Sequence, residues 1–365
     1  MKKAILLVHG MGKNTASANG KPGSFGKEFI DATNKALRRF SKHANDSIET
    51  YCDIHEFNYN EWFDKMRTIM ADNARSMSDR LNAIGMFPGA GSAAGLVAQL
   101  TAFEAKFKND QFFYTHWLDV LFYGTMLGAK VRVDAAAKIN ALVEQYGGSN
   151  VHIIAHSLGT ALTHDTLHLL YRAEHDPNDQ IPDLDVTTHK LGSIWMFANV
   201  SRLVNSITRL SDPLGSLVRP GVGGCTFKFT NTRHVLDPFT WPARFNPPND
   251  GSWVPNATYA TDYRPIVIDL ILDANTHSFT QYLSDPKVVE RLLPFFLESK
   301  FQGTIPEFNQ YVADYSAQSI QGAFTALQDS LKDALKESDQ VTGWMDFFNQ
   351  AKAFYEAVKH IKDNF

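Results

Sequence analysis

Residues 151–159 read Val-His-Ile-Ile-Ala-His-Ser-Leu-Gly, and this stretch decides the fold. Residues 151–155 are mostly apolar and do not alternate with polar residues, which is typical of a strand buried on both faces of a parallel sheet. A helix is predicted to follow at once, from about Leu158 to about Ala173. Ser157 therefore falls in the sharp turn that joins a buried strand to a helix.

Strands and helices alternate on both sides of this stretch. The other predicted strands cover 3–8, 47–58, 192–199, 225–231 and 265–272. The other predicted helices of this part of the chain cover 25–44 and 131–146. Such alternation is typical of a mostly parallel sheet with helices on both faces, so the sequence predicts an α/β fold.

Composition narrows the class of protein. The chain has 365 residues, of which 44% are hydrophobic, enough for one large domain with insertions or extensions. Its formal net charge of −4 argues against a nucleic-acid partner. Cys52 and Cys225 are too few for a disulfide framework, so we expect two buried free thiols, although one disulfide stays open. The apolar run at 4–8 is too short for a secretory signal, so a cytoplasmic location is expected.

Ser157 is a candidate nucleophile because of its local sequence. Small residues stand two positions before it and two after it, at Ala155 and Gly159. Small residues avoid clashes in a strained strand-to-helix turn that exposes a serine hydroxyl at the carboxyl edge of the sheet. The structural alternative is a serine that only caps the following helix.

The loop after the first predicted strand is a candidate oxyanion site. It reads His9-Gly10-Met11-Gly12, and glycine lets the backbone approach a substrate closely. Backbone N–H groups stabilise the negative charge that develops on a carbonyl oxygen during acyl transfer. We expect the N–H groups of Met11 and Leu158 to be the donors, with His9 as a structural hydrogen-bonding residue. A plain tight turn is the alternative.

A nucleophilic serine needs a base, and the base needs an orienting acid. His277 follows the last predicted strand, and Asp237 follows the strand that ends near Asn231. The carboxyl ends of parallel strands meet at one edge of the sheet, where such folds place their sites. The alternatives of lower rank are Asp262 and Asp269 as acids and His234 as base.

On these residues the chain resembles the α/β-hydrolase superfamily, in which the triad follows the chain order serine, acid, histidine. Residues 117–123 together with 151–159 resemble bacterial lipases and serine esterases. The resemblance implies an α/β-hydrolase fold and cleavage of carboxylic esters by Ser157, Asp237 and His277, with Met11 and Leu158 as oxyanion donors and no metal or cofactor. Ala155 departs from the pattern, because it stands where glycine is usual.

The resemblance also divides the chain. Residues 1–58 and 115–300 are expected to form the catalytic domain, 59–114 a helical cap insertion, and 301–365 a C-terminal helical extension. Within the insertion, 81–103 contains no Asp, Glu, Lys or Arg and is long enough to span a membrane, but its glycines and Pro88 favour a cap over an acyl pocket. The residues expected to contact substrate are His156, Phe112 and Trp117.

Several interpretations of the partner, the activity and metal binding stay open. The expected partner is a small ester or lipid, with contact at a lipid interface as an alternative and the oligomeric state undetermined. Phospholipase and thioesterase activity compete with simple ester hydrolysis, and a non-catalytic interaction protein is the rival from another class. His164 and His168 have a spacing that could bind metal, and the acidic loop at 174–185 could hold calcium. Both are expected to be structural or surface features instead.

Overall fold

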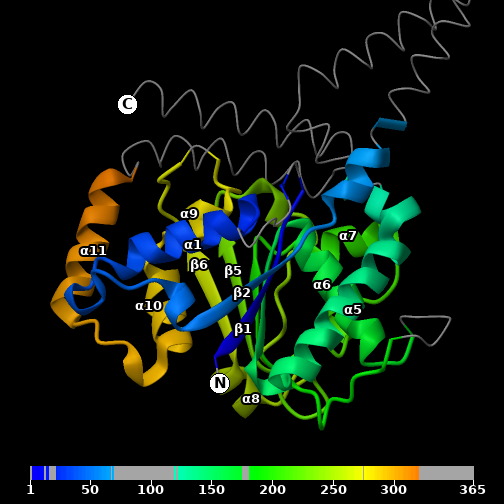
Figure 1. Ribbon diagram of the computed structural model, residues 1–365. Coiled ribbons are helices and arrows are strands. Elements are labelled where there is room, and N and C mark those ends of the chain that lie inside the picture. Colours follow the sequence, from blue (N-terminus) through cyan, green and yellow to red (C-terminus); the bar gives the residue numbers. More distant parts are fainter. Residues whose placement is uncertain are drawn as a thin grey trace, which may run out of the picture.

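The computed structural model describes residues 2–11, 14–15, 22–66, 68–69, 119–120, 122–174, 181–273 and 275–319. Six strands form one sheet in the order β2-β1-β3-β4-β5-β6, and every neighbouring pair is parallel (Figure 1). The strands are β1 (Lys3–Val8), β2 (Cys52–Phe57), β3 (Val151–His156), β4 (Leu191–Phe197), β5 (Thr226–His234) and β6 (Tyr263–Ile268).

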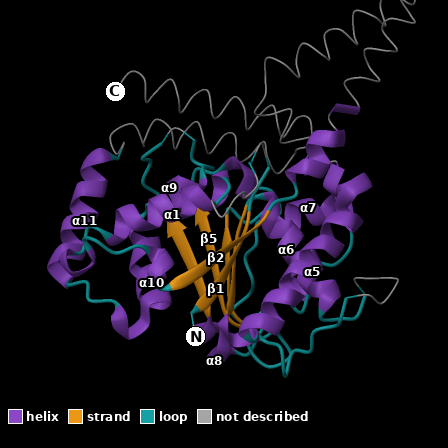
Figure 2. Cartoon of the chain, in the orientation of Figure 1, coloured by secondary structure: helices purple, strands orange, loops and turns teal. Residues whose placement is uncertain are grey.

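Helices cover both faces of the sheet (Figure 2). One face carries α5 (Gly128–Tyr146), α6 (Leu158–Leu170) and α7 (Ser201–Thr208). The other carries α1 (Ser24–Leu37), α9 (Phe279–Leu283), α10 (Pro286–Leu297) and α11 (Ile305–Gln318). The remaining elements are α8 (Asn256–Asp262), a π-helix (Tyr123–Leu127), helical residues at 60–66, and 3-10 turns at Ser41–His43, Ile48–Thr50, Gly148–Asn150, Pro213–Gly215, Pro238–Thr240 and Glu298–Lys300. The predicted α/β fold is confirmed.

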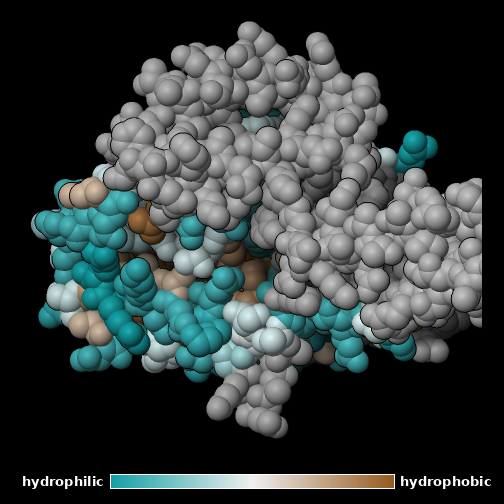
Figure 3. Space-filling model, turned by 90° about the horizontal axis from the view of Figure 1, so that it is seen from above, coloured by the Kyte–Doolittle hydropathy of each residue, from teal (hydrophilic) through white to brown (hydrophobic). Residues whose placement is uncertain are grey.

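The helices on the two faces of the sheet explain why the central strands are continuous apolar runs. On β1, Leu6 and Val8 belong to the core cluster beneath α5 and α6, whereas Ile5 and Leu7 belong to the cluster beneath α1 and α10. Both faces of the strand are thus shielded from water, which is why its residues do not alternate. Figure 3 looks down on the carboxyl edge, and the part of the described surface that is visible there is mostly hydrophilic, with small apolar patches.

Two predicted strands differ from the observed ones at their ends. The strand expected at 47–58 begins only at Cys52, because the side chain of Ser47 accepts a hydrogen bond from the Glu49 N–H and starts a 3-10 turn. The strand expected at 265–272 ends at Ile268, which pairs with His234, the last residue of β5. Among the strands that the structure describes, none extends further to pair with the residues that follow.

Parts of the predicted insertion and extension pack on the sheet and its helices. Tyr59 and Phe63 are fully buried against β1 in the first core cluster, and Tyr311 and Tyr315 of α11 are buried in the second. Both cysteines are free and buried, as expected. The stretch 81–103 lies outside the described residues, as do Phe112 and Trp117. None of the helices in the described ranges is long and apolar enough to cross a membrane.

Three buried histidines give the protein a predictable response to acid. Burial lowers the pKa of His9 and His168 to about 4 and that of His152 to about 3. The unfolded chain, where histidine keeps its ordinary pKa near 6.5, therefore binds protons first as the pH falls. Between pH 6.5 and 4 we expect the free energy of unfolding to decrease by about 1.4 kcal/mol per pH unit for each histidine.

Asp285 opposes this trend in part, because burial raises its pKa to about 6 and its folded form takes up a proton first. Urea unfolding at pH 7 and pH 5 measures the net effect. The variant His152→Gln should lose less stability on acidification than the wild type, because one of the three groups is gone. An identical loss in both proteins would contradict the assignment to buried histidines.

Candidate active site

Ser157 occupies a strained turn between β3 and α6. Its backbone has φ 54° and ψ −127°, a region that a residue with a side chain adopts at a cost of about 1–3 kcal/mol. The surroundings hold it there: the Ser157 N–H donates to the Phe197 carbonyl at 3.0 Å, and the Ser157 carbonyl accepts from Thr160 Oγ1 at 2.6 Å. Ser157 thus belongs to the turn itself, between the end of β3 at His156 and the start of α6 at Leu158.

Two glycines allow the loop after β1 to lie against this turn. A Cβ atom on Gly159 would come within 2.4 Å of the backbone oxygens of Val8 and His9. A Cβ atom on Gly10 would come within 2.7 Å of Ser157 Cβ. Larger residues at Gly10 or Gly159 would push the loop away from the turn. The loop and the turn can therefore lie this close only with glycine at both positions.

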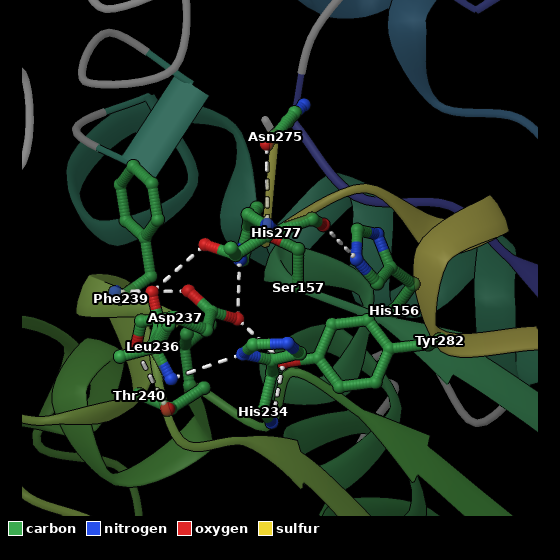
Figure 4. Close-up of polar contacts among 12 residues, drawn as sticks. His156, Ser157, His234, Leu236, Asp237, Phe239, Thr240, Asn275, His277 and Tyr282 are labelled. Carbon is green, nitrogen blue, oxygen red and sulfur yellow. Dashed lines mark hydrogen bonds and ion pairs between the residues drawn. The ribbon is translucent and has the colours of Figure 1, made fainter. Parts of the chain in front are cut away.

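The three predicted triad side chains lie in hydrogen-bond contact (Figure 4). His277 Nε2 is 2.7 Å from Ser157 Oγ, and His277 Nδ1 is 2.8 Å from Asp237 Oδ2. Ser157 and Asp237 are 1% and 0% exposed, and His277 is 5% exposed. A hydroxyl, an imidazole and a carboxylate therefore form one chain of contacts largely screened from bulk water.

Both carboxylate oxygens of Asp237 accept hydrogen bonds. Its Oδ1 accepts from the Phe239 N–H at 3.1 Å, and its Oδ2 accepts from the Tyr282 hydroxyl at 2.6 Å as well as from His277. A proton on His277 Nδ1 then faces Asp237, which leaves Nε2 unprotonated and able to accept the proton of Ser157.

The segment that carries His277 is anchored at several points. The His156 Nε2–H donates to the His277 carbonyl at 2.8 Å, and the His277 N–H donates to Asn275 Oδ1 at 3.2 Å. The Phe239 ring lies 4.4 Å from the His277 ring. His156 was expected to contact substrate; in the structure it supports the backbone of His277, and its contact with substrate stays a prediction.

The alternative acids and base lie in other interactions. Asp262 pairs with Lys228 Nζ at 2.6 Å, and Asp269 pairs with Lys287 Nζ at 2.7 Å. His234 uses Nε2 to bind the Leu270 carbonyl at 3.2 Å, and its Nδ1 accepts from a backbone N–H. Asp237 and His277 are therefore the acid and the imidazole that reach Ser157.

Tyr282 is a site residue that the sequence does not identify. Its hydroxyl donates to Asp237 and accepts from the His234 N–H at 3.0 Å. Burial and the adjacent carboxylate raise the pKa of Tyr282 well above that of a free phenol, so the hydroxyl keeps its proton. The one available signal is its place on α9, five residues after His277, which motif reasoning alone does not interpret.

The variant Tyr282→Phe should lower activity without abolishing it. It removes one of the two donors to Asp237 Oδ2 and leaves the His234 N–H without its acceptor, at a cost of about 1–3 kcal/mol in stability. We expect kcat to fall about tenfold, since Phe239 and His277 still hold the carboxylate. Steady-state kinetics and thermal unfolding measure the two effects, and an unchanged kcat would show that Asp237 does not depend on this hydroxyl.

The expected oxyanion donors lie beside the serine. Leu158 is the first residue of α6, whose N-terminus carries partial positive charge, and Met11 follows Gly10 in the loop against Ser157. Within the described part of the chain, no residue accepts a hydrogen bond from the backbone N–H of Met11 or Leu158.

The two histidines whose spacing could bind metal, His164 and His168, contact other groups. His164 Nε2 lies 2.6 Å from Ser216 Oγ, and His168 Nδ1 accepts from the Leu217 N–H at 3.3 Å. Among the residues that the structure describes, no three His, Cys, Asp or Glu side chains come together in a way that could hold a metal ion. In the acidic loop, residues 175–180 lie outside the described ranges.

The contact chain from Ser157 through His277 to Asp237 is suited to nucleophilic attack coupled to proton transfer. A serine hydroxyl that is hydrogen-bonded to a neutral imidazole can pass its proton to that imidazole while its oxygen attacks an electrophile. The buried Asp237 carboxylate stabilises the imidazolium that results.

Comparison with known proteins found no matching family model, no matching curated protein and no matching solved structure.

Proposed function

We propose that this protein is a serine hydrolase of the α/β-hydrolase type that cleaves carboxylic esters. The observation that carries the proposal is the contact chain from Ser157 Oγ through His277 to Asp237, at 2.7 Å and 2.8 Å, built on a serine in a strained turn. A serine that only capped a helix would need neither the imidazole nor the carboxylate.

The topology supports the same assignment. Ser157 follows β3, Asp237 follows β5, and His277 follows β6, so all three come from the carboxyl edge of one parallel sheet. The chain order serine, acid, histidine is the one associated with α/β-hydrolases, and differs from the orders in the two serine-protease folds.

The first half-reaction transfers the acyl group to the enzyme. His277 Nε2 takes the proton of Ser157 as Oγ attacks the ester carbonyl carbon. The N–H groups of Met11 and Leu158 bind the oxygen that becomes negative, a type of stabilisation worth about 2.7–4 kcal/mol per donor. His277 then gives its proton to the leaving alcohol as the carbon–oxygen bond breaks, which leaves an acyl group on Ser157.

The second half-reaction returns the enzyme to its starting state. A water molecule gives a proton to His277 Nε2 and attacks the acyl carbon, and the same two backbone donors bind the second oxyanion. The proton passes from His277 back to Ser157 Oγ as the acid product leaves. Asp237 stays ionised throughout and keeps the proton on His277 Nδ1 directed toward itself.

The proposal is tested by a fluorophosphonate probe together with a panel of acyl donors. The probe should label Ser157, as located by peptide mass spectrometry, and p-nitrophenyl esters of increasing chain length should be hydrolysed. Phospholipid and acyl-thioester substrates in parallel determine which acyl donor gives the highest kcat/KM. Absence of labelling and of hydrolysis across the panel, by folded protein, would favour a non-catalytic interaction protein instead.

A further inference from the structure

The peptide that links Gly10 to Met11 is held from one side by two buried side chains. The Tyr59 hydroxyl lies 3.0 Å from the Gly10 carbonyl oxygen and 2.8 Å from that of His9. His9 Nδ1 lies 2.6 Å from the same Gly10 oxygen. His9 and Tyr59 are 2% and 1% exposed, so water does not compete freely for this carbonyl.

The protonation of His9 follows from its contacts. The Tyr59 N–H donates to His9 Nε2 at 3.3 Å, so Nε2 is an acceptor. Burial lowers the pKa of His9 to about 4, and the neutral ring therefore carries its single proton on Nδ1, where it donates to the Gly10 carbonyl. The amide atom placed 3.1 Å from this Nδ1 is Asn14 Nδ2. Because two donors cannot bond to each other, a proton on His9 Nδ1 requires the Asn14 amide to be turned so that its oxygen faces the ring.

Tyr59 itself is rigidly placed. Its ring stacks on His9 with centroids 4.0 Å apart, and it meets Phe63 edge-on at 5.1 Å. The side-chain amides of Asn58 and Asn60 both donate to the Asn14 carbonyl, at 3.1 Å and 3.0 Å. The segment directly after β2 therefore clamps the loop after β1 at two places.

Peptide planarity connects this clamp to the reaction. In a trans peptide the C=O and the N–H point in opposite directions within one plane, and the described chain has no cis peptide bond. Fixing the Gly10 carbonyl therefore fixes the direction of the Met11 N–H. The Met11 N–H belongs to a loop that lies directly against Ser157, since a Cβ atom on Gly10 would come within 2.7 Å of Ser157 Cβ.

We infer that Tyr59 is a positioning residue for oxyanion binding, and that with His9 it orients the Gly10–Met11 peptide so that the Met11 N–H is preorganised before substrate arrives. The inference rests on the proposed function, because it assigns the peptide to an acyl-transfer site. A preorganised donor is not required to reorient during the reaction, which is the source of its effect on the rate.

The variant Tyr59→Phe tests the inference, because it removes the hydroxyl and keeps the ring that stacks on His9. With p-nitrophenyl acetate we expect kcat to fall by about tenfold to a hundredfold, less than the 10²–10³-fold loss of an entire donor, while KM changes little. The affinity for an aryl trifluoromethyl ketone, which forms a tetrahedral adduct with the serine, should fall by the same factor.

The matched control is Tyr171→Phe. The Tyr171 hydroxyl is also largely buried and donates to a backbone carbonyl, that of His189 at 2.6 Å, but this carbonyl precedes β4 at the opposite edge of the sheet. This variant should keep wild-type kcat and ketone affinity even if its stability falls. The pKa of the ketone adduct, read from the ¹³C shift of the labelled carbon, should rise in Tyr59→Phe alone.

The outcomes separate the two proposals. If the wild type hydrolyses esters and Tyr59→Phe matches it in kcat and ketone affinity, the positioning role is wrong and the hydrolase assignment stands. If the folded wild type hydrolyses nothing, the hydrolase assignment fails first. Should Tyr59→Phe not fold, the ketone complex of the wild type decides: an adduct oxygen bound by Leu158 without Met11 would overturn the inference, and one bound by both would support it.

Discussion

Replacing Ser157 with alanine is expected to lower ester hydrolysis by about 10⁵–10⁶-fold and to leave the fold intact. The change removes one oxygen that is 2.7 Å from His277 Nε2, and alanine keeps a Cβ atom in the same strained turn. The residual rate should come from oxyanion binding and substrate orientation alone, about 10³–10⁴-fold above water. Initial rates with p-nitrophenyl acetate and the loss of fluorophosphonate labelling measure the effect.

The chain supplies a matched control in a second serine that contacts a histidine. Ser216 is fully buried, and its hydroxyl lies 2.6 Å from His164 Nε2, yet it lies between a 3-10 turn and the amino end of β5 and does not follow the carboxyl end of a strand. The variant Ser216→Ala should hydrolyse esters at the wild-type rate. If it were the inactive one and Ser157→Ala retained activity, the nucleophile would be misassigned.

The triad was predictable because the geometry of a parallel sheet limits where its members lie. Residues that follow the carboxyl ends of parallel strands gather at one edge, so Asp237 and His277 could be selected by their position after the strands together with the chain order serine, acid, histidine. Ser157 was predictable for a second reason, since Ala155 and Gly159 are small, and a Cβ atom on Gly159 would clash with the backbone of Val8 and His9.

The supporting residues could not be predicted in the same way. Tyr282 acts through a hydroxyl that reaches Asp237 from α9, and Tyr59 acts through contacts with the loop after β1, some 50 residues earlier in the chain. Neither contact leaves a local pattern, because it depends on how distant elements pack. Tyr59 was predicted to start the cap insertion, although it is buried in the same core cluster as Leu6 and Val8 of β1.

Strand ends were uncertain for a related reason. Beyond Asp269, the apolar run resumes at residues 270–272 (Leu-Ile-Leu), and the sequence alone gives no reason to end the strand at Ile268. The end is imposed by β5, whose last residue pairs there. Asp269 therefore lies outside the strand, where it forms an exposed ion pair with Lys287.

Asp237→Asn is expected to lower kcat by about 10⁴-fold while Ser157 and His277 stay in place. Asp237 Oδ2 accepts from both His277 Nδ1 and the Tyr282 hydroxyl, and Oδ1 accepts from a backbone N–H. An amide cannot accept at both positions. Its NH₂ group, turned toward His277, favours the ring with its proton on Nε2, and that nitrogen can no longer accept the proton of Ser157.

The loss should appear in kcat more than in KM, because the wrong tautomer affects proton transfer and leaves the binding of ester intact. Asp262→Asn is the matched control, since it removes a carboxylate that pairs with Lys228 and contacts no member of the triad. That variant should retain the wild-type kcat. A larger loss in Asp262→Asn than in Asp237→Asn would mean that the acid of the site is misassigned, whereas equal, small losses would mean that His277 is oriented without any carboxylate.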